Sequence, residues 1–226
     1  MLISILFSQN VDPLDAVLQF IILFFVFTFS LSIRCYAQAL AAYKMGDLTP
    51  KAMGRLTLNP VKHFDLKGFI FFLLVGVGWS KAVPINPINF KKYRKGIRWV
   101  SSAGIIANFA MGSVAMLVYL IFNRTLGCPN EFMSYFYLVL QIVMLVNSFL
   151  VMFNILPIYP LDGFNFVSSF LNGQNGFVKF NIKYGVTILF AVLAISVCSD
   201  LLFGVDLFDF YLKILYNYVY IPIALI

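Results

Sequence analysis

The sequence has little charge and almost no histidine. Charged residues make up 11% of the 226 residues and hydrophobic residues make up 62%, whereas soluble domains carry about 25% charged residues. This composition excludes an ordinary soluble domain and predicts a polytopic membrane protein. The chain has one histidine, His63, so a two-histidine metal site cannot be built from it. The three cysteines, at positions 35, 128 and 198, form no Cys-x-x-Cys motif and no recognisable disulfide framework.

The net charge of +7 comes from basic residues that gather beside apolar segments. Eleven of the sixteen Lys and Arg residues lie between Lys44 and Arg98. Such asymmetry is typical of cytoplasmic loops under the positive-inside rule. We therefore expect no nucleic-acid partner, a cytoplasmic location for this segment, and an external N-terminus.

The apolar runs predict one membrane domain over residues 1–226. A first span is expected at about 14–44, because an uncharged run continues into an alanine-rich stretch that favours helix. Residues 45–96 are predicted to form a cytoplasmic and re-entrant insertion, since the apolar run at 68–79 is about half as long as a spanning helix. Further spans are expected at 97–122, 132–156, 183–203 and 210–226. The predicted fold class is an all-α polytopic membrane protein with a small irregular or β-rich membrane-associated insertion.

Five short motifs occur in order along the chain. The first is Arg34-Cys35-Tyr36-Ala37-Gln38, at the end of the first apolar run, followed by small residues and a Gly-Asp pair at 46–47. The others are residues 54–60 with His63 and Asp65, residues 78–87 with Asn89 and Phe90, Ala103 and Gly104 with Asn108, and residues 154–157 with 160–163. In residue types and order, these motifs resemble the site-2 protease family of intramembrane zinc metalloproteases. The resemblance implies a site-2-protease-like helical core and, for the family, zinc and regulated intramembrane proteolysis.

The resemblance also assigns the catalytic positions. In that family, two histidines at i and i+4 and a distant aspartate hold zinc, and a glutamate beside the first histidine is the general base. Arg34 and Gln38 stand at the histidine positions, Cys35 stands at the general-base position, and Asp162 is the surviving ligand. Arginine has no lone pair to offer zinc. The HExxH motif is therefore degenerate, and we expect no zinc cofactor and an inactive Cys35.

Several roles remain open at this point. Arg34 could form an ion pair with Asp162, or it could extend to the cytoplasmic interface. Asn108 and Asn154 could contact a substrate, or they could form hydrogen bonds between helices. The resemblance assigns Pro157 and Gly163 to the substrate groove or to its support.

Three functions are compatible with these motifs. The first is a pseudoprotease that binds a transmembrane helix of a substrate or partner among membrane lipids and could associate with an active relative. The second is an active intramembrane metalloendopeptidase with an unorthodox or partner-completed metal site. The third is a hydrolase with Cys35 as nucleophile and His63 as its base. In each case we expect an integral protein of the bacterial cytoplasmic membrane.

Overall fold

The structure is a computed structural model, which describes residues 13–75, 78–127 and 130–203. Within these ranges the chain forms helices and no strand. The prediction of an all-α polytopic membrane protein is confirmed, and of the two alternatives for the insertion the described residues take the irregular one. The expected span at 210–226 lies outside the described residues.

Four helices in the described part of the chain are long and apolar enough to cross a membrane. They are α2 (Pro13–Met45), α6 (Tyr93–Thr125), α7 (Glu131–Ile155) and the Gly176–Ser196 part of α9 (Gly176–Phe203). These helices overlap the predicted spans at 14–44, 97–122, 132–156 and 183–203. Helix α6 begins at Tyr93 and not at the expected residue 97, so it includes the last part of the basic run. The chain is therefore an integral membrane protein.

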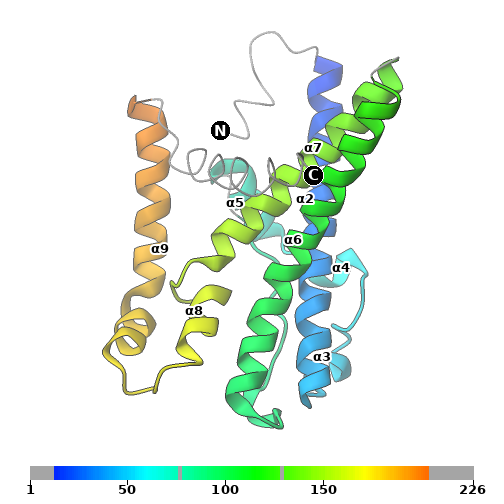
Figure 1. The fold of residues 1–226 in the computed structure, drawn as a ribbon. Coiled ribbons are helices and arrows are strands. Elements are labelled where there is room, and N and C mark those ends of the chain that lie inside the picture. The colour runs from blue at the N-terminus through cyan, green and yellow to red at the C-terminus, as the bar shows by residue number, and fades with distance from the viewer. Residues whose placement is uncertain (1–12, 76–77, 128–129, 204–226) are drawn as a thin grey trace.

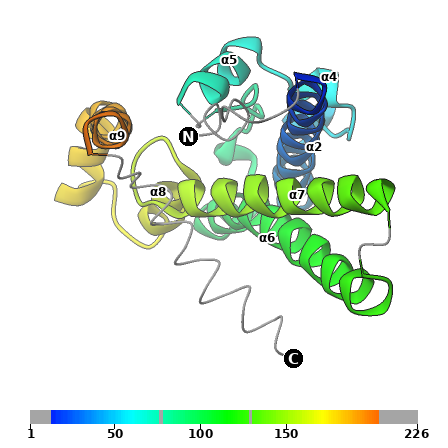
Figure 2. The same ribbon diagram turned by 90° about the horizontal axis from the view of Figure 1, so that it is seen from above.

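Helices α2, α6 and α7 form the central bundle (Figure 1). The buried face of α6 carries Gly96, Gly104 and Gly112, and small residues allow helices to approach closely in membranes. The short helix α8 (Asp162–Ser168) packs against α6 and α7. Figure 2 shows α9 set apart from α2, α6 and α7, and its Leu193 belongs to one hydrophobic cluster with Phe149 of α7.

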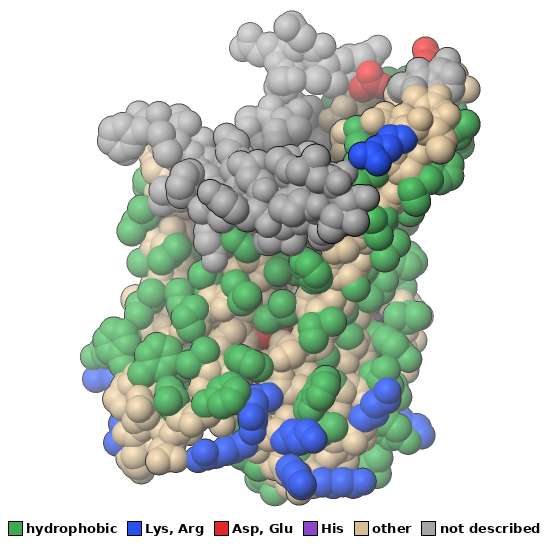
Figure 3. All heavy atoms as spheres, viewed as in Figure 1, with side chains coloured by type: hydrophobic (Ala, Val, Ile, Leu, Met, Phe, Trp, Pro, Cys, Tyr) green, Lys and Arg blue, Asp and Glu red, His purple; other side chains and the backbone are tan. Residues whose placement is uncertain are grey.

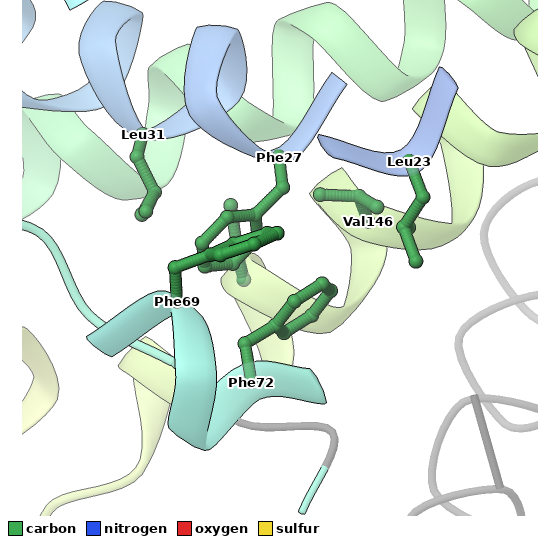
Figure 4. Packing of buried hydrophobic residues seen from close by; sticks show 7 residues of the cluster. Leu23, Phe27, Leu31, Phe69, Phe72 and Val146 are labelled. Carbon is green, nitrogen blue, oxygen red and sulfur yellow. The ribbon is translucent and has the colours of Figure 1, made fainter. Parts of the chain in front are cut away.

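The insertion between α2 and α6 contains four short helices: α3 (Thr49–Ala52), α4 (Pro60–His63), α5 (Leu66–Val75) and the 3-10 helix η1 (Pro87–Asn89). Helix α5 is too short to span a membrane and packs against α2. Figure 4 shows Phe69 and Phe72 of α5 beside Phe27 of α2 and Val146 of α7. The rings of Phe27 and Phe72 stack with centroids 3.9 Å apart. Protein thus covers one side of this half-length helix, as membrane-embedded elements require.

Asp47 holds the extended chain before η1 against the end of α2. Its buried carboxylate accepts hydrogen bonds from the Asn86 backbone N–H (2.7 Å), the Asn89 side chain (2.9 Å) and the Thr49 hydroxyl (2.6 Å). Burial alone would raise the pKa of Asp47, but these hydrogen bonds outweigh it and hold the pKa below its ordinary value. The contacts hold Asn86 and Asn89 beside the C-terminal end of α2.

The charge distribution predicts the orientation of the bundle. Figure 3 shows Lys and Arg side chains gathered at the end of the molecule where α2 ends and α6 begins, and acidic side chains near the opposite end. We expect Lys92→Cys, in a background lacking the native cysteines, to stay unlabelled by an impermeant external thiol reagent in intact cells. Leu126→Cys is the matched control and should be labelled, because Leu126 is 57% exposed just after the other end of α6. The reverse pattern would contradict the topology.

Candidate functional site

Helix α2 presents Arg34 and Gln38 on one face, because residues four apart lie one turn above each other. Both side chains contact Asp162, the first residue of α8. Nη2 of Arg34 lies 2.5 Å from Oδ2 of Asp162. Nε2 of Gln38 donates to both carboxylate oxygens, at 3.0 and 2.9 Å. The side chains of Arg34 and Asp162 are 14% and 11% exposed, so the ion pair is largely removed from water.

Asn154 and Gly104 complete the surroundings of Arg34. Asn154 accepts a hydrogen bond from Nη2 of Arg34 at 2.6 Å and donates one to the Leu150 carbonyl within α7. A Cβ atom at Gly104 would lie 3.0 Å from Cγ of Arg34 and 3.1 Å from Nε2 of Gln38. The absence of a side chain at Gly104 therefore leaves room for both α2 side chains against α6.

The position of Asp162 depends on Gly163. A Cβ atom at Gly163 would lie 2.2 Å from the carbonyl oxygen of Ile155 and 2.6 Å from that of Leu156. The start of α8 therefore touches the backbone at the end of α7, and this approach brings the Asp162 carboxylate to α2.

A cavity of about 430 Å³ opens beside the ion pair. Its walls come from α2, α6, α7, the extended chain at 78–85 and the start of α8. Leu31, Val83 and Phe153 supply apolar surface, while Arg34 and Asp162 supply the charged part. Segments that lie far apart in the sequence thus meet around the cavity, and its lining includes both apolar and charged side chains.

Cys35 faces this cavity, but His63 does not line it. The Cys35 Sγ lies 3.0 Å from the Ser80 Oγ, and the residue is 1% exposed. Nε2 of His63 is instead hydrogen-bonded to the Thr57 carbonyl at 2.8 Å. The structure therefore does not supply His63 as a base for Cys35. Ser80 also belongs to the site. It lies within the motif at residues 78–87, but the sequence did not identify it as a site residue, because a single serine in an extended segment has no characteristic spacing to other functional residues.

Two further residues of the predicted site lie away from the cavity lining. Asn108 is 0% exposed on α6, and neither of its side-chain polar atoms has a hydrogen-bond partner among the described residues. Pro157 is exposed just beyond the end of α7. The structure thus brings Arg34, Cys35, Gln38, Asn154 and Asp162 together, with Gly163 in support.

The side chains at this site do not fit a zinc ion. Zinc sites in proteins use three or four donors from Cys, His, Asp or Glu. No group of three such residues converges anywhere in the described ranges. The guanidinium of Arg34 donates hydrogen bonds at the position where a ligand would have to offer a lone pair.

One protein with a curated description resembles this chain. It is the "Putative zinc metalloprotease YwhC" of Bacillus subtilis (strain 168), with 36% identity over 135 residues. The chain is similar to a protein named as a zinc metalloprotease. The alignment covers 58% of this chain and 60% of that protein, so the chain spans less than two thirds of its relative's length. The similarity supports a metalloprotease-like family and zinc within that family. No family model and no solved structure matches the chain.

Proposed function

We propose that this chain is a site-2-protease-like membrane protein that binds a transmembrane segment without hydrolysing it. The bound segment belongs to a substrate-like protein or to a membrane partner, which could be an active relative. The proposal rests on two features: the chemistry around Asp162 and the cavity beside it.

The contacts of Asp162 carry the proposal. In a zinc hydrolase the metal supplies the positive charge and activates a water molecule. Here the guanidinium of Arg34 supplies the positive charge beside the carboxylate, and Gln38 donates to both carboxylate oxygens. A permanently protonated arginine neither binds a metal nor accepts a proton from water. Cys35, at the position of the family's general base, has its Sγ 3.0 Å from the Ser80 Oγ, and a thiol is not the carboxylate that the family uses there.

The cavity supports a retained binding role. Its lining includes the extended chain at 78–85 and residues of α7. Extended chain inside a bilayer carries backbone groups that need hydrogen-bond partners. A locally unwound transmembrane segment has the same need, so the two can satisfy each other. The apolar walls accommodate its side chains.

Metal analysis tests the proposal. We expect the purified full-length protein to retain far less than one zinc per chain after dialysis. The matched variant Arg34→His/Cys35→Glu/Gln38→His places two histidines at i and i+4 beside Asp162, and we expect it to gain about one zinc per chain. Adding Asp162→Ala to that variant should remove the metal again.

The alternative function is an active metalloendopeptidase, and the name of the Bacillus relative favours it. One zinc per chain in the unmodified protein, retained on dialysis and lost in Asp162→Ala, would contradict the pseudoprotease and support this alternative. A cysteine-dependent hydrolase would instead lose its activity on alkylation of Cys35.

A further inference from the structure

A second cavity, of about 410 Å³, lies on the outer surface between α6 and α8, away from Asp162. Its lining residues are Lys95, Arg98, Trp99, Ser102, Ile106 and Phe166. Five of these six residues come from α6, where they recur at spacings of three and four and so share one face of the helix. We call this surface the α6–α8 groove.

The groove changes from basic to apolar along α6. Lys95 and Arg98 lie within the first two turns of the helix, and Ile106 lies about two to three turns further along. Trp99 and Ile106 are 51% and 57% exposed. Since α6 is a candidate membrane span, its basic end lies at the predicted cytoplasmic interface and its apolar end lies in the hydrocarbon region.

The positive charges of the groove have no carboxylate partner in the part of the chain that the structure describes. Neither Lys95 nor Arg98 forms an ion pair with a carboxylate in the ranges 13–75, 78–127 and 130–203. Arg98 is held in place, since its Nε donates to the Arg94 carbonyl at 3.2 Å and its guanidinium lies 4.6 Å from the Phe170 ring centroid. An oriented guanidinium at the membrane surface is suited to a phosphate oxygen.

We propose that the α6–α8 groove binds one anionic phospholipid of the cytoplasmic leaflet. The lipid phosphate lies between Lys95 and Arg98. One acyl chain follows Trp99 and Ile106 towards the membrane centre and contacts Phe166 of α8. The occupant is a lipid because a free anion would use the basic end and leave the apolar walls without a partner. Trp99 lies between the basic and the apolar part of the groove. Tryptophan is enriched at the membrane–water interface, which is where the lipid headgroup would lie.

Tryptophan quenching by brominated lipids tests the site in the full-length protein. Trp99 is one of two tryptophans, so Trp79→Phe isolates its fluorescence. In phosphatidylcholine vesicles we expect brominated phosphatidylglycerol to quench Trp99 with about two- to fivefold higher apparent affinity than brominated phosphatidylcholine. Lys95→Ala with Arg98→Ala should bring this ratio close to one. Excess inorganic phosphate should leave the ratio unchanged.

The matched control is Lys62→Ala with Lys67→Ala, which removes the same charge from exposed residues outside the groove. The control should keep the preference for phosphatidylglycerol. Equal quenching by both lipids would overturn the proposal, because the groove would then hold bulk lipid without selection. An equal loss in the control would also overturn it, since net charge and not this groove would attract the lipid. Displacement by phosphate would overturn it in favour of a free-anion site.

Discussion

Asp162→Ala is expected to lower the free energy of unfolding of the detergent-solubilised protein by about 3–5 kcal/mol. The change leaves the guanidinium of Arg34 in a largely buried position with Asn154 as its remaining side-chain acceptor. It also removes the acceptor of Gln38. The double variant Arg34→Met with Asp162→Ala should be markedly less destabilised, because replacing both members of a buried pair with apolar groups can be nearly neutral.

A double-mutant cycle measures this coupling directly. The control pair is Arg94→Met with Asn172→Ala, since Arg94 donates to the Asn172 side chain at 2.8 Å on the exposed surface. Surface contacts are worth about 0.2–1 kcal/mol, so the control cycle should give a small coupling energy. A coupling energy near zero for Arg34 and Asp162 would mean that the two charges do not interact in the folded protein. Arg34 would then reach the cytoplasmic interface instead.

Gly163→Ala is expected to cost about 3 kcal/mol of the free energy of unfolding, because the new methyl group would overlap the backbone of α7. The neighbouring atoms are the carbonyl oxygens of Ile155 and Leu156, at 2.2 and 2.6 Å from the ideal Cβ position. Backbone atoms cannot rotate away as a flexible side chain can. Helix α8 must shift, and Asp162 shifts with it. Equilibrium unfolding in detergent measures the loss.

Gly173→Ala is the matched control, because nothing lies within 4 Å of its Cβ position. That substitution should change the free energy of unfolding by no more than about 0.5 kcal/mol. If both glycine variants unfold alike, α8 does not approach α7 as closely as described. The pair of variants therefore separates the close contact at Gly163 from the general effect of replacing glycine.

The membrane spans could be predicted from the sequence because a spanning helix requires a long continuous run of apolar residues. The run before Arg34 is uncharged over most of a bilayer thickness, and α2 follows from it. The early start of α6 was not predicted. The run before Trp99 is basic, and hydropathy alone does not distinguish an irregular surface segment from the part of a helix that extends beyond the membrane. The irregular form of the insertion was left open, because short apolar segments support either a helix or a strand.

The candidate site shows a similar division. The motif order pointed to Arg34, Gln38 and Asp162 as a group, because each stands at a matched position in the resemblance. The roles of Ser80 and Gly104 were not readable from that order. A serine in an extended segment and a glycine in a helix have many uses, and their roles here depend on which side chain lies opposite. The α6–α8 groove also required the structure, since Phe166 comes from a different helix than the basic residues.

The sequence by itself determined that this is a helical membrane protein and that one chain lacks the histidines of a zinc protease. Composition, apolar run length and residue identity are local properties, so no fold is needed to read them. Only the tertiary structure decided that Arg34 and Gln38 both contact Asp162 and that Asn154 joins them. Those contacts join residues 120 or more positions apart. They depend on the close approach of α8 to α7 and of α6 to α2, which small residues such as Gly163 and Gly104 permit and which no single segment specifies.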